Sequence, residues 1–242
     1  MKEDLLLSIR DISKSFGRRK ILDNISFDIQ KGKITGFLGP NGAGKTTTIK
    51  LLLGLIKKDT GQIELNGKEI QDVKNLRFNI IIGSLMEFPS FYSNLTAREN
   101  LKILSLSDNY QIDEKRIDYL LNLVDLKNGK DRQIKTFSFG MKQKLAIADA
   151  LLNDPELLIL DEPFTGLDPN SIDSLNKILK NFVKNNGTIF VSSHILSEVE
   201  DLCYWIILIN KGKIIHQGEL KPLISQKSLK EIYLKFTKDE NI

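Results

Sequence analysis

One eight-residue segment constrains the fold of this chain more than any other. It reads Gly39-Pro40-Asn41-Gly42-Ala43-Gly44-Lys45-Thr46 and matches G-x-x-x-x-G-K-S/T, the pattern of a phosphate-binding P-loop. Residues 34–38 before it form a short apolar segment, typical of a buried strand, and the apolar residues of 47–56 have helical spacing. This strand–loop–helix context favours a P-loop over a glycine-rich turn that merely precedes Lys and Thr.

The residue types of this segment suit a multiply charged phosphate. Glycines let the backbone bend so that successive N–H groups point at an anion, and the following helix adds the positive end of its dipole. Lys45 can reach the β- and γ-phosphates, and the Thr46 hydroxyl can bind Mg²⁺. The segment therefore predicts a site for a nucleoside triphosphate with Mg²⁺.

Length and composition describe an ordinary globular protein. The 242 residues, 41% hydrophobic and 27% charged, allow one large domain or two small ones. The net charge of +4 is spread along the chain and gives only weak support for nucleic acid or an anionic membrane as a partner. Cys203 is the only cysteine, which excludes an intrachain disulfide and fits a reducing cytosol.

The sequence shows neither a signal peptide nor a membrane span. Its N-terminus is charged, and no apolar run approaches the roughly 20 residues needed to cross a bilayer. If the protein acts at a membrane, we expect another subunit to supply the membrane part.

Residues 5–38 read as strands with turns, because their apolar residues alternate. Residues 61–70 predict a hairpin that turns at Asn66-Gly67. Phe16 lies in a turn-like segment upstream of the P-loop. Such an aromatic residue can stack on a nucleobase, but its spacing alone favours a core or turn position.

In residues 86–150 the strand patterns give way to helical patterns, which predict a helical subdomain. After a loop at 89–94, Thr96 and Glu99 have the spacing of a capping box at the start of a helix. Apolar residues in 117–124 indicate a second, amphipathic helix.

Two acidic residues follow the apolar run 157–160, which is typical of a buried parallel strand. Asp161 is placed to hold the water shell of Mg²⁺, and Glu162 to orient or deprotonate an attacking water. Alternatively, either acid caps the next turn, a reading that the P-loop disfavours. A helix is expected at 170–184.

His194 follows a second apolar strand, expected at 187–193, where it can contact a γ-phosphate or its attacking water. A lone histidine is usually a bystander, and only the other motifs favour a role for it. We expect His216 to lie on the surface and residues 220–242 to form a charged helix that packs on the core.

The predicted fold class is α/β: a P-loop NTPase core with a mostly parallel sheet and helices on both faces. An N-terminal antiparallel β-subdomain and an inserted α-helical subdomain complete it. We expect one domain over residues 1–242, in which 1–85 and 151–220 form the core with its β-subdomain. Residues 86–150 form the helical subdomain and 221–242 the tail.

The segment Phe137-Ser138-Phe139-Gly140-Met141 resembles the signature motif of ABC ATPases, usually Leu-Ser-Gly-Gly-Gln. Aromatic Phe16, the P-loop, the acidic pair at 161–162, the D-loop 166–168 and the switch residue His194 occur in the family's order over nearly the whole chain. Taken alone, residues 137–141 would read as an ordinary Ser-capped helix start.

The resemblance implies a head-to-tail homodimer that encloses two ATP molecules with Mg²⁺. Ser138 and Gly140 would stand at the start of a helix, expected at 142–152. The N-terminal N–H donors of this helix would face the γ-phosphate held by the opposite subunit. The catalytic residues implied are Lys45, Glu87, Glu162 and His194, and the metal-binding residues are Thr46, Glu87 and Asp161. The ATP-binding residues implied are Phe16, now as the adenine-stacking residue, Gly39, Pro40, Asn41, Gly42, Ala43, Gly44, Lys45, Thr46, Thr47, Ser138, Gly140 and Asp168.

Three positions depart from the family pattern. Phe139 stands where glycine is usual, Met141 where glutamine is usual, and Glu87 where the family has a glutamine that touches Mg²⁺ and water. Bulky side chains beside the γ-phosphate are expected to narrow or reshape the dimer interface. We expect Glu87 to keep the metal and coupling role.

Residues 87–101, together with the unusual signature, are similar to the bacitracin-resistance and lantibiotic-immunity branch. This resemblance implies the nucleotide-binding subunit of a peptide-antibiotic exporter, a separate integral membrane permease, and a place on the cytoplasmic, inner face of the membrane. No direct contact with nucleic acid is expected.

Two other classes are weighed against it. A soluble ABC ATPase acting on nucleic acid, ribosomes or cofactor assembly is disfavoured by the lack of coiled-coil heptads, a second ATPase half and a strong basic patch. A P-loop kinase or GTPase leaves the signature and His194 unexplained.

Overall fold

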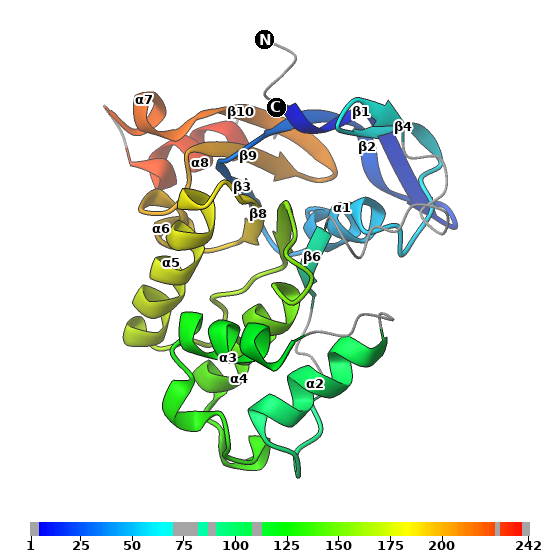
Figure 1. The fold of residues 1–242 in the computed structure, drawn as a ribbon. Coiled ribbons are helices and arrows are strands. Elements are labelled where there is room, and N and C mark those ends of the chain that lie inside the picture. The colour runs from blue at the N-terminus through cyan, green and yellow to red at the C-terminus, as the bar shows by residue number, and fades with distance from the viewer. Residues whose placement is uncertain (1–4, 70–81, 87–90, 108–112, 226–227, 239–242) are drawn as a thin grey trace.

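The computed structural model describes residues 5–69, 82–86, 91–107, 113–225 and 228–238. Within these residues the strands form two sheets (Figure 1). The antiparallel sheet has the order β2-β1-β4-β5, with β1 (Leu5–Phe16), β2 (Arg19–Gln30), β4 (Thr60–Leu65) and β5 (Lys68–Glu69). The main sheet has the order β10-β9-β3-β8-β7-β6, with β3 (Ile34–Leu38), β6 (Ile82–Leu85), β7 (Leu157–Leu160), β8 (Thr188–Ser193), β9 (Trp205–Asn210) and β10 (Lys213–Glu219).

The main sheet is parallel except at one edge, where β10 pairs antiparallel with β9. Strands β3, β7 and β8 are buried along their whole length, as is typical of central strands in a parallel sheet that is covered on both faces. The described helices are α1 (Lys45–Leu52), α2 (Ala97–Ser107), α3 (Glu114–Leu123), α4 (Phe139–Ala150), α5 (Pro169–Lys184), α6 (Leu196–Glu200), α7 (Leu220–Ile224) and α8 (Leu229–Lys238). These features confirm the predicted α/β fold class.

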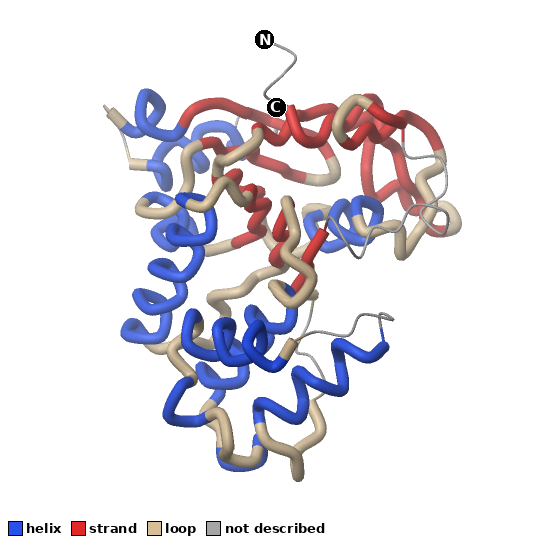
Figure 2. Tube along the Cα trace, viewed as in Figure 1, coloured by secondary structure: helices blue, strands red, loops and turns tan. Residues whose placement is uncertain are grey.

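Two apolar clusters hold the layers together. One lies between the two sheets and includes α1; there the rings of Phe27, Phe37 and Phe190 have centroids 5.2–5.8 Å apart. The other lies on the opposite face of the main sheet and extends into helices α2–α5. Figure 2 shows the strands gathered in the upper part of the molecule, together with α1, α7 and α8, and only helices and loops in the lower part.

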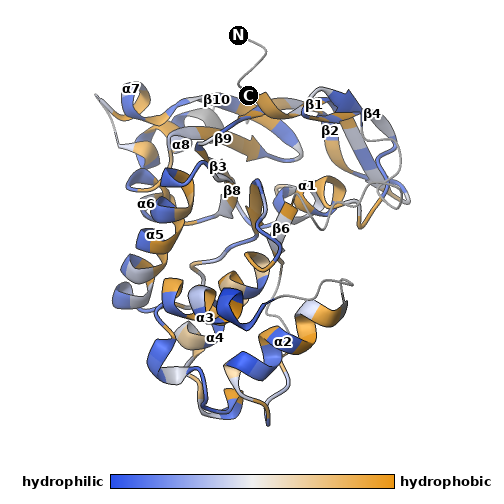
Figure 3. Cartoon of the chain, viewed as in Figure 1, coloured by the Kyte–Doolittle hydropathy of each residue, from blue (hydrophilic) through white to orange (hydrophobic). Residues whose placement is uncertain are grey.

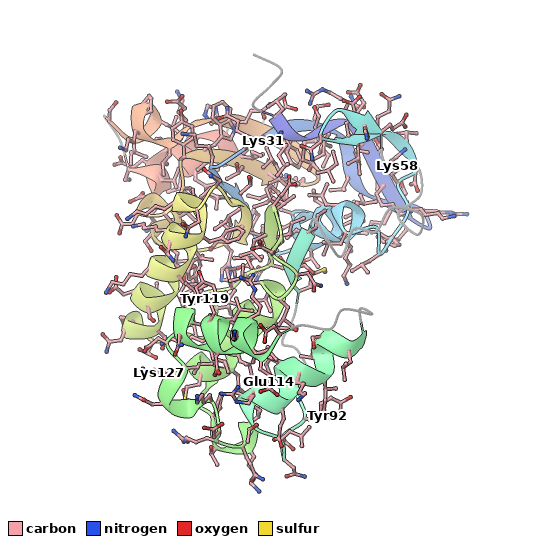
Figure 4. All side chains as sticks on the ribbon, in the orientation of Figure 1. Lys31, Lys58, Tyr92, Glu114, Tyr119 and Lys127 are labelled. Atoms are coloured by element: carbon pink, nitrogen blue, oxygen red, sulfur yellow. The ribbon has the colours of Figure 1, made fainter. Side chains whose placement is uncertain are left out.

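The helical part carries the local signals that the sequence predicted. The backbone N–H of Thr96 donates to Glu99 Oε2 at 2.7 Å, and the Glu99 N–H donates to Thr96 Oγ1 at 3.2 Å, which confirms the capping box. In Figure 3 helix α5 carries both hydrophobic and hydrophilic residues, and its Leu175, Ile178 and Leu179 are buried. Figure 4 places Tyr92, Glu114, Tyr119 and Lys127 on this lower part of the molecule.

The hairpin turn is also as predicted. Asn66 and Gly67 both have positive φ, 50° and 72°, which is the backbone of a type I′ turn, and they connect β4 to β5. Its expected end at Ile70 lies outside the described residues. The boundaries of the subdomains at residues 85, 150 and 220 stay a prediction.

Several expected boundaries were wrong. Helix α1 ends at Leu52 instead of continuing to 56, because Gly54 turns left-handed at φ 65° and Leu55 N donates back to Lys50 O. Helix α4 spans 139–150 rather than 142–152, and α5 begins at Pro169.

The C-terminal prediction was also wrong in part. The described tail contains two helices, α7 and α8, rather than one. His216 is half-buried rather than on the surface, since the strand that carries it packs at the sheet edge, and burial lowers the pKa of its imidazole. None of the helices in the described ranges is both long enough and apolar enough to span a bilayer.

Candidate active site

The P-loop connects β3 to α1, and its glycines are required by its geometry. Gly44 has φ 111°, a conformation that L side chains rarely adopt. A Cβ atom on Gly39 would lie 2.3 Å from the carbonyl oxygen of Ile209 in β9. The loop therefore needs glycine at both positions to pass this close to the neighbouring strand.

Lys45 is held at the first turn of α1 with its ammonium inside the loop. Its side chain is only 6% exposed, and Nζ donates to Gly39 O at 2.8 Å and to Pro40 O at 3.2 Å. The same ammonium lies 3.1 Å from Glu162 Oε1. These contacts pair the buried ammonium and hold it at the centre of the site.

Asp161 follows β7 and joins three elements. Thr46 Oγ1 donates to its Oδ2 at 2.8 Å, and Ser192 Oγ donates to its Oδ1 at 2.6 Å. Ser192 Oγ also accepts the backbone N–H of Glu162 at 2.9 Å. The sequence reasoning missed Ser192, which lies two residues before His194 at the end of the apolar run of β8.

Glu162 has a left-handed backbone, φ 50°, which is uncommon outside glycine and recurs at functional sites. This backbone places Oε1 against Lys45, and Oε2 lies 2.6 Å from His194 Nδ1. Burial acts to raise the pKa of Glu162, but hydrogen bonds from His194 and Lys45 and the charge of Lys45 outweigh it. The pKa of the carboxyl is therefore lowered, and the group is an anion at neutral pH.

Lys45, Thr46, Glu162 and His194 border a cavity of about 480 Å³, and Asp161 lies just behind Thr46. Its lining consists of Arg19, Ile21, Asn41, Gly42, Gly44, Lys45, Thr46, Thr47, Glu162, Thr165 and His194. The structure thus brings together the P-loop, Glu162 and His194, as expected. Arg19 and Ile21 were missed because they reach the cavity from β2, a strand distant from the motifs, and Thr165 was missed because no pattern marks it within the turn after Glu162.

Phe16 ends β1 and is 53% exposed, so it is not a core residue. It pairs across the hairpin with Arg19, one of the residues that line the cavity. The ammonium of Lys14 lies 5.4 Å from the centroid of its ring. Its ring is thus free of the core at the rim of the hairpin, as a stacking residue would need to be.

The donor set fits both expected ligands. Buried Lys45 and the start of α1 offer positive charge to phosphates. Thr46 Oγ1 and Asp161 Oδ2 are adjacent oxygens, the hard donors that Mg²⁺ prefers. In the described part of the chain no group of three or more His, Cys, Asp or Glu residues is placed to hold a metal.

The signature segment lies elsewhere. Ser138 caps α4 and accepts the Met141 N–H at 3.3 Å, and Asp168 caps α5. Ser138, Gly140 and Asp168 do not line the cavity of their own chain. Glu87 lies outside the described residues, so its role stays a prediction.

The structure separates the two unusual signature residues. Met141 is half-buried, and its methyl lies 3.1 Å from the position that a Cβ atom on Gly129 would take, in the core of the helical part. Phe139 is 40% exposed and packs on Gly166. Met141 is thus a packing residue that points away from the surface expected to carry the signature, and Phe139 alone changes that surface.

Glu198 in α6 lies behind His194 and supports its loop. Ser193 Oγ donates to Glu198 Oε2 at 3.0 Å and accepts the Ile195 N–H at 2.9 Å. Burial raises the pKa of Glu198 above its usual value, and the hydrogen bond from Ser193 opposes this only in part. The folded state therefore disfavours the charged form of this carboxyl.

Glu198→Gln is expected to raise the Tm at neutral pH, because it removes a charge that the fold disfavours. The folded pKa lies above the unfolded value near 4.5, so the gain is full above the raised pKa and disappears as the pH falls toward 4.5. Thermal unfolding of both proteins between about pH 4 and 8 measures it. Glu156→Gln, at an exposed position, is the charge-matched control. A gain that grows toward low pH would contradict the assignment.

A P-loop at the carboxyl edge of a parallel sheet, faced by groups from the next strand ends, defines a P-loop nucleoside triphosphatase. Within that class the chain belongs to the ABC transporter family, whose sequence pattern matches residues 22–165. The predicted family is thereby confirmed, and the chain is the ATP-binding ATPase subunit of an ABC transporter.

Two curated relatives cover most of this chain. The lantibiotic transport ATP-binding protein SrtF of Streptococcus pyogenes is 46% identical over 214 residues, 88% of this chain and 91% of the relative. The bacitracin transport ATP-binding protein BcrA of Bacillus licheniformis is 45% identical over 218 residues, 88% of this chain and 69% of the relative.

Solved structures agree with the fold. An ATP-binding subunit of an ABC transporter matches with a TM-score of 0.83 and 30% identity, covering 96% of this chain and 99% of the other. The protein cbiO1 of Clostridium perfringens, part of the transporter complex cbiONQ, matches with a TM-score of 0.85 and 27% identity, covering 98% of each chain.

Proposed function

We propose that this chain powers the export of a lantibiotic or another peptide antibiotic, in self-immunity or resistance, by hydrolysing ATP beside a separate membrane permease. The observation that carries the proposal is its similarity, over 88% of its length, to relatives named for lantibiotic and bacitracin transport. The permease would place it on the cytoplasmic face of the membrane, with no direct role for nucleic acid.

The contacts of Lys45 suggest how binding prepares hydrolysis. Lys45 is paired with Glu162, and the β- and γ-phosphates of ATP would compete with that carboxylate for the ammonium. Turning Lys45 to the phosphates removes a hydrogen bond and a charge that lower the pKa of Glu162. Glu162 then becomes a stronger base for the attacking water, while His194 holds its second oxygen in place.

Thr46 and Asp161 would hold Mg²⁺ beside the phosphates, where the ion neutralises their charge. Ser192 would fix the orientation of Asp161 through its other oxygen. From the sequence alone we infer that Glu87 would also contact Mg²⁺. Phe16 would stack on the adenine from the rim of the hairpin.

The position of the signature favours action in pairs. Ser138 and Gly140 lie at the start of α4, where the backbone N–H groups can bind an anion. Neither residue lines the cavity of its own chain. In a head-to-tail homodimer the Ser138 turn of each copy would face the triphosphate of the other. ATP would then stabilise the closed dimer, and its hydrolysis would open it.

Co-expression with candidate permeases in a sensitive strain tests the export function. The cells are challenged with lantibiotics, bacitracin and an unrelated non-peptide drug. We expect resistance to at least one peptide antibiotic, none to the unrelated drug, and loss of resistance with Glu162→Gln. An active ATPase that protects against no peptide and instead copurifies with ribosomes or nucleic acid would support the soluble alternative.

A further inference from the structure

The N-terminal turn of α4 packs against the loop at residues 166–168, which the sequence identified as the D-loop. Phe139, at the first position of the helix, lies over Gly166. A Cβ atom on Gly166 would come within 3.3–3.4 Å of two carbons of the Phe139 ring, tighter than most such contacts. Gly166 also has φ 79°, a backbone that favours glycine, and any side chain there would push the Phe139 ring aside by a few tenths of an ångström.

A second close approach lies one residue further along. A Cβ atom on Gly140 would fall 2.6 Å from Ser171 Oγ, so α4 and α5 touch here through backbone and hydroxyl. The same hydroxyl donates to Asp168 Oδ2 at 2.6 Å, and the Ser171 N–H donates to Asp168 Oδ1 at 3.1 Å. Asp168, Ser171 and Gly140 are thus tied in one chain of contacts beside the Phe139 ring.

We propose that Phe139 is a positioning residue for ATP hydrolysis, which fixes the D-loop relative to the Ser138 turn so that both meet the opposite site as one rigid unit. The inference rests on the proposed head-to-tail dimer. A glycine at position 139, usual in the family, has no side chain to lay on Gly166. The phenyl ring replaces a solvated gap with a packed contact between two segments 27 residues apart in the chain.

The two unusual positions of the signature then have separate tasks. Met141 anchors the turn to the helical part, at Gly129, and Phe139 anchors it to the loop that follows the catalytic acids. Neither Phe139 nor Gly166 lines the cavity that receives ATP from the P-loop side. Loss of the ring is therefore expected to lower kcat and to leave the KM for ATP nearly unchanged.

Steady-state ATPase kinetics of the full 242-residue chain test this assignment. Phe139→Ala is expected to lower kcat about tenfold, below the hundredfold that a 1 Å displacement can cost, with KM within about twofold. Phe139→Tyr, which keeps the ring, retains most of the kcat. Ile103→Ala removes an apolar side chain of nearly equal exposure, 38%, from α2 and serves as the control with unchanged kinetics.

A double-mutant cycle of Gly166 and Phe139 measures whether the two residues are coupled in kcat. A general loss of stability would not produce such coupling. Gly166→Ala lowers kcat in the parent because the new methyl group meets the Phe139 ring. In the Phe139→Ala background it lowers kcat by a smaller factor, since the steric part of its cost is gone. Thermal unfolding of each variant identifies any that fails to fold, and Phe139→Leu replaces Phe139→Ala in that case.

Unchanged kcat in Phe139→Ala, a change confined to KM, or equal impairment by Phe139→Tyr would overturn the assignment. ATP-driven dimerisation of Glu162→Gln is measured in parallel. If that protein dimerises while Phe139→Ala keeps the kcat of the parent, the role of Phe139 is wrong and the dimer stands. If it never dimerises, the dimer and the role of Phe139 are both wrong.

Discussion

Glu162→Gln is expected to bind ATP and to hydrolyse it at least about a hundredfold more slowly, the usual size of a general-base effect. Glutamine keeps the shape of the side chain, and its single oxygen can accept from either Lys45 or His194, whereas its NH2 group can only donate. It cannot take a proton from water, and it cannot balance the charge of Lys45. Binding should therefore survive while the chemical step fails.

Single-turnover hydrolysis and equilibrium ATP binding separate these two effects. Glu198→Gln is the matched control, because it changes the same functional group on the far side of the His194 loop and should keep most of the turnover. Normal turnover in Glu162→Gln would remove this carboxylate from the mechanism, and another group would have to activate the water.

Lys45→Met is expected to weaken ATP binding by about tenfold or more, the usual effect of losing a hydrogen bond to a charged group, roughly 1.5–3 kcal/mol. Methionine has a similar length but no charge to offer the phosphates. The variant also leaves Glu162 without the hydrogen bond and the charge of Lys45, so the pKa of that carboxyl should rise.

Calorimetric titration with ATP measures the affinity of the variant. Lys50→Met is the control, because it removes the same charge from the last turn of α1 and lies outside the cavity. Equal ATP affinities of Lys45→Met and the parent would show that the buried ammonium stabilises the P-loop and does not bind the nucleotide.

The parts of the site that the sequence predicted are those with local causes. The P-loop requires glycine at positions 39 and 44 for reasons of backbone geometry, and Lys45 and Thr46 follow directly in the chain. Asp161, Glu162 and His194 were expected together because parallel strands end at the same edge of a sheet, and they do lie at neighbouring strand ends. The capping box and the Asn66-Gly67 turn are likewise determined by a few adjacent residues.

The parts that the sequence did not predict depend on contacts between distant segments. Arg19 lines the cavity from β2, and Ser192 contacts Asp161 from the neighbouring strand of the sheet. Thr165 follows Glu162 in the same turn, but no short pattern marks it as a lining residue. Met141 and Phe139 point to different partners, Gly129 and Gly166, because residues two positions apart in a helix lie on nearly opposite sides of it. From sequence alone both looked like bulky residues beside the same phosphate.

The central claim is that two copies of this chain enclose the nucleotides, with each Ser138 turn directed at the other's triphosphate. Light scattering of Glu162→Gln with ATP and Mg²⁺ tests it most directly, with ADP as the control. We predict that ATP with Mg²⁺ doubles the molecular mass of Glu162→Gln and that ADP does not. We predict no doubling with ATP in the double variant that also carries Ser138→Arg. A mass that stays that of a single chain at saturating ATP, even in the presence of the permease, would contradict the account.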